Sequence, residues 1–266
     1  MYIPFYQVDA FSDGPFSGNP AAVCLMTSWP DDSVLQKIAQ ENNLSETAFY
    51  VNNAAEGTQN LRWFTPATEV DLCGHATLAT AAVLFEMHQS GVNELAFYTR
   101  SGLLSVRREG HFYSMNFPAV HASVTDRPVG LEEALGLLPG DVDAVLVASD
   151  LIVVLHDESK LDSLQPDFVR LATSPHRGVV VTAKSGDDSF RSRWFGPQVG
   201  VNEDPVTGSA HTFLAPYWAG RLGKNTLSAV QGGTRKGRLT CRLIGDGRVE
   251  LVGEARLVIR GEFILP

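Results

Sequence analysis

The chain has 266 residues, of which 44% are hydrophobic and 19% are charged. This length suits two domains of about 130 residues, each able to bury an ordinary core, and the composition excludes a disordered or low-complexity protein. The net charge of −9 argues against a partner with a phosphate backbone, so we expect no nucleic acid. The most apolar stretch, Ala76–Met87, is far shorter than the roughly 20 residues that span a bilayer, so we expect no membrane association.

Common metal and cofactor motifs are missing from the sequence. The three cysteines are widely spaced and odd in number, which predicts neither a disulfide framework nor a paired-cysteine zinc site. The seven histidines form no His-x-His or His-x-x-x-His pair, and no glycine-rich nucleotide loop occurs. We therefore expect no metal site and no bound dinucleotide or nucleoside triphosphate. We also expect a reducing cytoplasmic location, because the cysteines form no disulfide framework and the N-terminus lacks the pattern of a signal peptide.

Short strand-type runs dominate the first half, separated by glycine and proline turns. The segment 33–42 carries one apolar stripe and predicts an amphipathic helix, and a turn is expected at Ala55-Glu56-Gly57. Gly74–His88 predicts a helix of another kind, because apolar side chains leave it almost no polar face. Such a helix must be enclosed by other elements. The strands that can enclose it are predicted at 3–11, 21–25, 47–51, 61–64, 95–99, 103–107 and 112–117.

The pattern restarts after a junction at 118–140, which is rich in proline and glycine and carries a short helix at 131–137. A second apolar helix is predicted at Ser209–Arg221. It should kink or stop early at Pro216, because proline lacks a backbone N–H. The other elements predicted here are a helix at 165–173 and strands at 143–148, 151–155, 178–183, 188–195, 237–244, 248–253 and 255–264.

One strand–loop–helix unit occurs twice. Arg62-Trp63-Phe64-Thr65-Pro66 leads into Gly74-His75-Ala76, and Arg193-Trp194-Phe195-Gly196-Pro197 leads into Gly208-Ser209-Ala210. The duplication predicts an α+β fold of two pseudo-symmetric domains, each with a sheet wrapped around a central helix, rather than a parallel βαβ sheet. Each domain would bring a helix N-terminus, which attracts anions, to a shared cleft.

We place the domains at 1–120 and 121–254. The last strand, at about 255–266, can pack back on the first domain.

Glu46 is the first candidate catalytic residue. It lies in Asn43-Leu44-Ser45-Glu46-Thr47-Ala48-Phe49, between an amphipathic helix and an apolar strand. Partial desolvation by its apolar neighbours would favour the protonated carboxyl and suit a general acid/base. The alternative is a solvent-facing glutamate at a helix end, and the local sequence leaves both readings open.

The two helix starts carry the other candidates. His75 follows Gly74 and is either a proton carrier or a hydrogen-bonded structural histidine. Asp204 precedes Gly208 and Ser209 and is either a second acid/base group or a capping aspartate. Because His75 and Asp204 fall in equivalent loops of the two halves, a shared catalytic role is favoured.

Four motifs in this order complete the pattern. They are Val8-Asp9-Ala10-Phe11 with Gly18-Asn19-Pro20-Ala21-Ala22-Val23, the Glu46 segment quoted above, Asp71-Leu72-Cys73-Gly74-His75-Ala76-Thr77-Leu78-Ala79, and Asn202-Glu203-Asp204-Pro205-Val206-Thr207-Gly208-Ser209-Ala210. Together they resemble the phenazine-biosynthesis PhzF family, a member of the diaminopimelate-epimerase-like superfamily. The resemblance runs from about residue 5 to residue 264.

The resemblance implies two β-barrel-like domains, an active site in the cleft between them, and a homodimer. It also implies cofactor-independent isomerisation of a small carboxylate-bearing substrate. Glu46 would move a proton between two carbons, assisted by His75 and Asp204. The substrate carboxylate would lie against the backbone amides at Gly74, Gly208 and Ser209.

The racemases of that superfamily use one thiol from each domain. Cys73-Gly74-His75 resembles the first thiol motif, but the loop that holds Asp204 carries no second cysteine. We therefore interpret Cys73 as a buried structural residue and Glu46 as the base. Two alternatives stay open: an epimerase or racemase that uses Glu46 with Cys73, and a non-catalytic protein that binds small acids.

Overall fold

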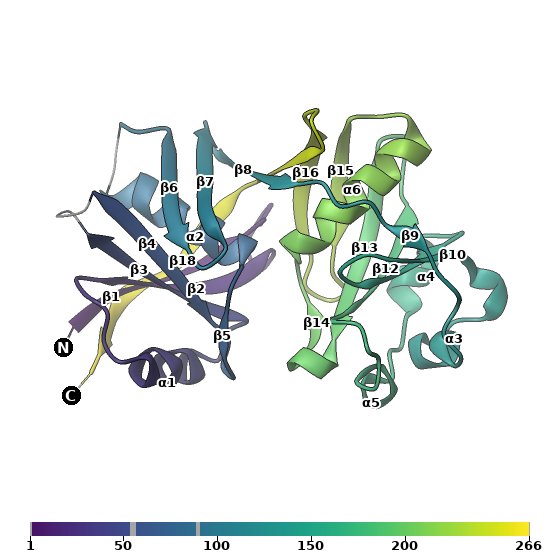
Figure 1. Ribbon diagram of the computed structural model, residues 1–266, viewed down its shortest axis with the longest axis horizontal. Coiled ribbons are helices and arrows are strands. Elements are labelled where there is room, and N and C mark those ends of the chain that lie inside the picture. The colour runs from purple at the N-terminus through teal and green to yellow at the C-terminus, as the bar shows by residue number, and fades with distance from the viewer. Residues whose placement is uncertain (1, 54–56, 89–90, 266) are drawn as a thin grey trace. The chain divides into compact units, whose positions relative to one another are not determined.

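The structure is a computed structural model that describes residues 2–53, 57–88 and 91–265 (Figure 1). The chain divides into two compact units, one made of Met1–Asn116 with Val252–Pro266 and the other of Phe117–Leu251. The predicted turn at Ala55-Glu56 lies outside the described residues. A search of the described part of the chain finds no helix long and apolar enough to cross a membrane.

The first unit alternates strands with helices, and its last strand comes from the C-terminal end of the chain. A π-helical segment at Leu84–His88 extends the second helix. The elements are β1 (Tyr2–Ala10), β2 (Asn19–Met26), α1 (Asp32–Asn42), β3 (Glu46–Asn53), β4 (Thr58–Phe64), β5 (Glu69–Val70), α2 (Gly74–Val83), β6 (Glu94–Thr99), β7 (Gly102–Glu109), β8 (Phe112–Pro118) and β18 (Ala255–Ile264).

The second unit follows the same plan with shorter outer helices. Two 3-10 turns, at Pro139–Asp141 and Pro197–Val199, join some of its elements. The elements are β9 (Ser123–Val124), α3 (Leu131–Leu135), β10 (Val142–Val147), β11 (Leu151–Leu155), α4 (Ser159–Ser163), α5 (Phe168–Leu171), β12 (Val179–Lys184), β13 (Ser189–Gly196), β14 (Val201–Asp204), α6 (Gly208–Leu222), β15 (Thr226–Gln231), β16 (Gly237–Leu243) and β17 (Arg248–Gly253).

Strand pairing repeats between the units in both order and direction. In the first unit β2 pairs in parallel with β3, β3 antiparallel with β4, and β4 in parallel with β6. In the second unit β11 pairs in parallel with β12, β12 antiparallel with β13, and β13 in parallel with β15. The predicted internal repeat is therefore confirmed. Most of the pairings are antiparallel, as expected for an α+β fold, although β2–α1–β3 joins two parallel strands through a helix.

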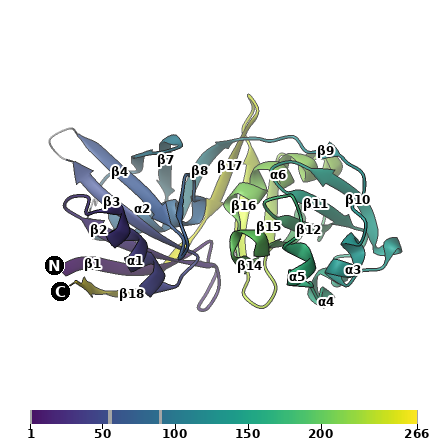
Figure 2. The ribbon, with the colours of Figure 1, turned by 60° about the horizontal axis from the view of Figure 1, so that its bottom comes forward.

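Helix α2 is enclosed as its sequence requires. Every residue from His75 to Val83 is buried, and α2 contacts β1, β2, β3, β7 and β18 (Figure 1 and Figure 2). The hydroxyls of Thr77 and Thr80 donate to carbonyl oxygens one turn earlier, at 2.6 and 2.8 Å. These bonds let a polar side chain lie inside the sheet without an unpaired donor.

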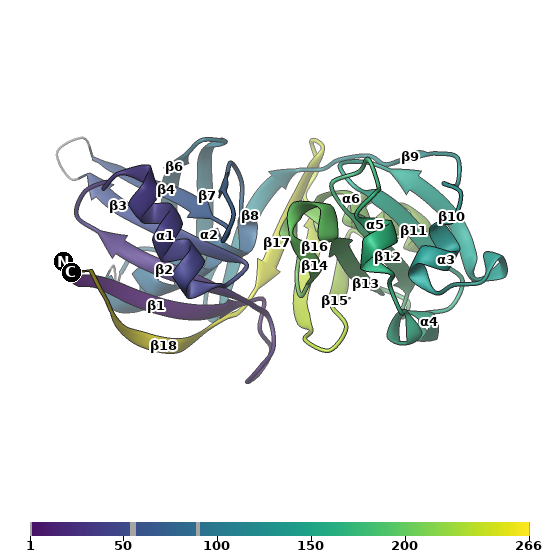
Figure 3. The ribbon, with the colours of Figure 1, turned by 90° about the horizontal axis from the view of Figure 1, so that it is seen from below.

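Helix α1 covers the opposite face of β3 and lies in front of the strands in Figure 3. Its buried residues Leu35 and Ile38 pack with Phe49 and Val51 of β3. Since side chains alternate along a strand, Ala48 then lies on the other face, toward α2. The sheet is thus a layer between an outer amphipathic helix and an inner apolar one.

Helix α6 continues through Pro216 to Leu222, so the early stop predicted at this proline is wrong. Proline cannot donate to the carbonyl of Thr212 one turn earlier. That carbonyl instead accepts a hydrogen bond of 2.9 Å from the backbone N–H of Val120. A donor from a distant part of the same unit therefore satisfies the group that the proline leaves without its helical partner.

Strand β18 pairs antiparallel with β1 from Tyr2↔Ile264 to Ala10↔Ala255. The two strands run side by side, with the N- and C-termini together at one end (Figure 3). The C-terminal strand therefore completes the unit that contains the N-terminus.

The repeated arginine has the same role in both units. Arg62 of β4 makes a two-pronged ion pair with Glu69 of β5, with bonds of 2.7 and 2.8 Å. Arg193 of β13 makes the equivalent pair with Glu203 of β14, with bonds of 2.8 and 2.9 Å, and also donates to the carbonyl of Leu161. Each arginine thus fixes the strand that leads to the central helix.

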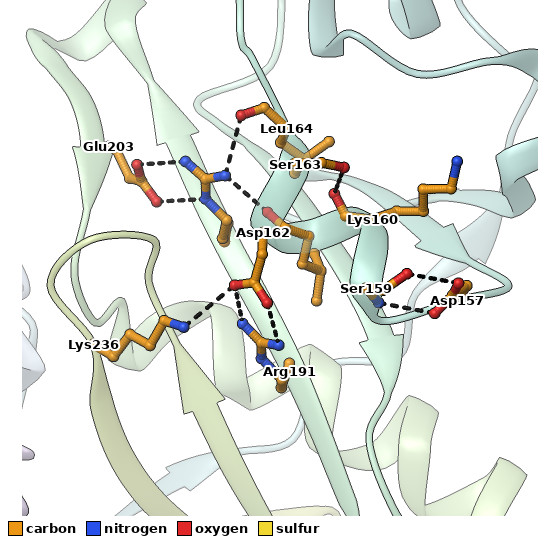
Figure 4. Close-up of polar contacts among 11 residues, drawn as sticks. Asp157, Ser159, Lys160, Asp162, Ser163, Leu164, Arg191, Glu203 and Lys236 are labelled. Atoms are coloured by element: carbon orange, nitrogen blue, oxygen red, sulfur yellow. Dashed lines mark hydrogen bonds and ion pairs between the residues drawn. The ribbon is translucent and has the colours of Figure 1, made fainter.

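A second charge cluster ties α4 to the sheet of the second unit (Figure 4). The Asp162 carboxylate accepts bonds of 2.6 and 3.0 Å from Arg191 and one of 3.3 Å from Lys236. The hydrogen bonds and charge of Arg191, with a smaller effect of Lys236, hold the pKa of Asp162 well below its usual range.

We expect Arg193→Met to lower the free energy of unfolding by about 3 kcal/mol, because it leaves the Glu203 carboxylate and a buried carbonyl without their donor. Arg170→Met is the matched control, since the Arg170 side chain is 61% exposed in its pair with Asp167. The control should change stability by no more than about 0.5 kcal/mol. Urea denaturation measures both variants, and equal small losses would contradict the structural role of Arg193.

Candidate functional site

Glu46 is the first residue of β3 and pairs with Ala21 of β2 in the parallel ladder. Its side chain is 18% exposed, so it is neither in open solvent nor fully enclosed. The alternative of a freely solvated glutamate at a helix end does not describe this environment. Because β3 and β2 fix its backbone, the carboxylate has a defined position.

His75 connects Glu46 to Cys73. His75 Nε2 lies 3.1 Å from Glu46 Oε2, and His75 Nδ1 lies 3.5 Å from Cys73 Sγ. His75 itself is only 5% exposed. Two of the predicted site residues therefore contact each other, and a third group, the Cys73 thiol, lies on the other side of the imidazole.

The start of α2 keeps its backbone donors available. Cys73 occupies the N-cap position, and its side chain makes no capping hydrogen bond within the described structure. Gly74 follows as the first helical residue. The first backbone N–H groups of a helix have no partner inside the helix, so those at Gly74 and its neighbours can bind an anion.

Burial and charge act together on the three side chains. Burial, assisted by the negative charge of Glu46, raises the pKa of the Cys73 thiol to about 11, so the thiol is neutral at pH 7. Burial by itself lowers the pKa of His75, but negative charge on Cys73 and Glu46 outweighs it and raises that pKa well above 6.5.

Glu46, Cys73 and His75 also offer three possible metal ligands within 4.8 Å of one another. Sequence spacing could not reveal this set, because Glu46 comes from a distant strand. An imidazole binds a metal through one nitrogen, whereas His75 turns Nδ1 to Cys73 and Nε2 to Glu46. The geometry suits proton transfer through the ring better than the binding of one ion by all three groups.

Asp204 ends β14 and belongs to a buried network at the start of α6. Its carboxylate accepts a bond of 2.6 Å from the Thr207 hydroxyl, and its carbonyl accepts one of 2.9 Å from Gln231. Gln231 also accepts from the Thr207 N–H at 3.1 Å. These contacts give Asp204 a role in shaping the turn before Gly208.

The registers of the paired strands show that His75 and Asp204 lie in equivalent loops but not at equivalent positions of the two units. Trp63 pairs with Val70, and the matching Trp194 pairs with Asp204. The helix then starts the same number of residues later in each unit. Asp204 therefore corresponds to Val70, whereas His75 corresponds to Ser209.

A further cluster in the second unit was missed by sequence reasoning. Arg177 donates to Asp150 at 2.8 and 2.7 Å and to the Ser209 hydroxyl at 3.1 Å. Trp194 also donates to Asp150, at 2.9 Å. The four residues come from separate segments, and only the position of Arg177 just before a predicted strand could have drawn attention to it.

Comparison with known proteins identifies the family. A family model described as phenazine biosynthesis-like protein matches residues 8–261. The chain belongs to this family. A relative from Pseudomonas aeruginosa, named an uncharacterized isomerase, is 58% identical over 261 residues, covering 98% of each chain. A PhzF-family crystal structure from Enterococcus faecalis is 44% identical, with a TM-score of 0.93 over 100% of both chains.

A solved epimerase structure shares the fold of this PhzF-family chain. A hydroxyproline epimerase from Agrobacterium vitis has a TM-score of 0.63 at 10% identity, covering 98% of this chain and 91% of that one. The predicted fold class, α+β and epimerase-like, is thereby confirmed. The name of the Pseudomonas aeruginosa relative supports a family of isomerases, whereas the epimerase supports the fold alone.

We expect Glu46→Gln to lower the pKa of His75, because the charge and the contact of the Glu46 carboxylate are among the causes that raise it. NMR titration of the His75 imidazole measures the shift, and an unchanged titration would contradict the proposed pairing. Because the folded-state pKa is raised, the pair stabilises the fold fully below about pH 6.5 and loses this effect as the pH rises through that pKa. The difference in unfolding free energy between the wild type and Glu46→Gln should therefore shrink as the pH rises through the pKa of His75.

For His211 of α6 we expect the opposite pH dependence of the unfolding free energy. It donates through Nδ1 to the Thr207 carbonyl at 2.9 Å, and burial lowers its pKa to about 4. Its stabilising effect is present above about pH 6.5 and is lost as the pH falls toward 4, because the unfolded chain gains a proton first. We expect the unfolding free energy of the wild type to fall by about 3 kcal/mol more than that of His211→Gln across this range.

Urea denaturation at pH 7 and pH 4 gives both free energies for this comparison. Parallel pH profiles for the two proteins would show that His211 is not buried in its neutral form.

Proposed function

We propose that this protein is a cofactor-independent isomerase that moves a proton between two carbons of a small carboxylic acid. The observation that most supports it is the 3.1 Å contact between Glu46 Oε2 and His75 Nε2 beside the start of α2. A carboxylate base, a protonated imidazole and free helix amides are what such a reaction needs.

Glu46 acts as the base. Its carboxylate takes a proton from a carbon that is α or vinylogous to the substrate carboxylate, and the electron pair of the C–H bond delocalises toward that carboxylate. Glu46, now protonated, returns the proton to a different carbon as the electron pair forms the new C–H bond. No redox change occurs, and the product is an isomer of the substrate.

His75 controls the charge of this base. As an imidazolium it stabilises the Glu46 carboxylate between turnovers, and it can donate a proton or a hydrogen bond to charge that develops on the substrate. The contact with Cys73 holds the ring from its other side. Amides at Gly74 and at Gly208 and Ser209 would stabilise the negative charge of the intermediate.

The remaining parts of the proposal rest on the family resemblance. Asp204 would relay or orient protons, and the active site would lie in a cleft between the domains. The homodimer and the cytoplasmic location stay predictions of the same kind.

An epimerase that uses Glu46 with Cys73 is the second candidate, supported by the epimerase fold and by the contact between Cys73 and His75. The raised pKa of Cys73, about 11, opposes it, because a neutral thiol is a poor base at pH 7. Cys73→Ser distinguishes the two: the isomerase should keep most of its activity, whereas the epimerase should lose nearly all of it.

The direct test is hydrogen exchange at carbon. The protein is incubated in deuterated water with a panel of small unsaturated carboxylic acids, and NMR detects deuterium in the acid or its isomer. Glu46→Gln should lower the rate about 10³-fold, in the range expected for a general base. Glu41→Gln, an exposed glutamate of α1, is the control and should retain full activity.

Full activity in Glu46→Gln would overturn the assignment. Binding of an acid by the wild type without any exchange at carbon would support the non-catalytic alternative.

Asp204 needs a substitution that separates catalysis from folding. Asp204→Asn keeps an acceptor for the Thr207 hydroxyl but cannot transfer a proton. If Asp204 handles protons, the exchange rate should fall about 10²-fold while the melting temperature stays close to that of the wild type. A variant with full activity and unchanged stability would assign Asp204 to the turn alone.

A further inference from the structure

The second unit cannot carry a counterpart of Glu46. Ala48 pairs with Trp63 in the first unit, and Val180 pairs with Trp194 in the second, so Gly178 corresponds to Glu46. A Cβ atom at Gly178 would lie 2.4 Å from the Trp194 indole. The tryptophan therefore excludes any side chain at the position of the base.

Arg177, one residue earlier, faces the helix start instead. Its Nη2 donates to the Ser209 hydroxyl at 3.1 Å, and Ser209 is the second residue of α6 just as His75 is the second residue of α2. In each unit, a charged side chain beside the start of a strand thus contacts the second residue of the central helix. The charge is negative at Glu46 and positive at Arg177.

Arg177 is held in place by a buried scaffold. Asp150 is 0% exposed and accepts from Arg177 Nε and Nη2 and from the Trp194 indole. The guanidinium carbon lies 5.6 Å from the centre of the Trp194 ring. Because Asp150 and the indole fix two sides of the guanidinium, its orientation is set before any ligand arrives.

The other side of the guanidinium remains available. Within the described residues, Arg177 Nη1 has no hydrogen-bond or ion-pair partner, and the side chain is 42% exposed. Ser209 accepts from Arg177, so its own hydroxyl hydrogen is free to donate elsewhere. Nη1 and the Ser209 hydroxyl are therefore neighbouring donors that one anion can use together.

We propose that Arg177 and Ser209 bind the carboxylate of the substrate in preference to a phosphate. This inference rests on the proposed function, since it assigns the carboxylate that the isomerase needs. Asp150 already takes one edge of the guanidinium and balances much of its charge, so the remaining donors suit a monoanion better than a phosphate dianion. Arg177 would thus supply an electron-withdrawing contact to the carboxylate of the substrate.

The test is equilibrium binding of benzoate, compared with its neutral analogue benzamide and with inorganic phosphate, followed by NMR shifts of the backbone amides. Arg177→Gln should weaken benzoate binding at least tenfold and leave benzamide binding unchanged. Arg177→Lys should recover part of the loss, and Ser209→Ala should weaken benzoate about threefold. Arg170→Gln, an exposed arginine of the same unit, is the control and should change nothing.

Loss of Arg177 leaves Asp150 buried without its charge partner, which endangers folding. The double variant Asp150→Asn with Arg177→Gln removes both charges and should fold while still binding benzoate at least tenfold more weakly. Unchanged benzoate affinity in either variant would overturn the inference. So would an equal loss for benzamide, tighter binding of phosphate, or no binding of benzoate by the wild type.

These outcomes are separable from those of the proposed function, because binding at equilibrium needs no turnover. Benzoate bound through Arg177 by a protein that exchanges no deuterium would leave this inference standing and overturn the isomerase. Exchange that persists at the wild-type rate in Arg177→Gln would do the reverse.

Discussion

A helix without a polar face is the constraint on which both units depend. Helix α2 buries every residue from His75 to Val83, and such a helix is stable only where other elements surround it. Strands therefore wrap around it, and the amphipathic helix α1 closes the outside of the sheet. The one part of α2 that the sheet cannot satisfy is its first turn, whose N–H groups have no helical partners. The reactive side chains gather at this point because it is where the enclosed helix meets polar groups.

The two units keep the features that hold the frame and differ in those that face the helix start. The arginine that fixes the strand before the central helix pairs with a glutamate in both, as Arg62 with Glu69 and Arg193 with Glu203. The tryptophan beside it differs, because only Trp194 donates to a buried aspartate within the described structure. Its indole then fills the space over Gly178 and leaves no room for a second glutamate. The orientation of the Trp194 side chain therefore makes the two helix starts differ, although the surrounding strands match.

The electrostatics of the first unit follow from the same enclosure. Burial favours the neutral forms of Cys73 and His75, but the negative charges of Cys73 and Glu46 together reverse the preference of the histidine. The thiol stays neutral, and the charge resides on the pair formed by Glu46 and His75. The raised pKa of the thiol favours a carboxylate base over the thiol chemistry that the Cys73 motif resembles.

The sequence alone determined the repeat, the two apolar helices and the candidates Glu46 and His75, because these depend on local patterns of apolar, turn and charged residues. It did not predict the parallel pairing of β2 with β3, or the route by which α6 passes Pro216, where Val120 donates to Thr212. Only the tertiary structure brought Glu46 to His75 and joined Asp150, Arg177, Trp194 and Ser209. Both groups consist of side chains from elements far apart in the chain. Their meeting depends on strand register, which long-range backbone hydrogen bonds fix and which no local pattern of residues encodes.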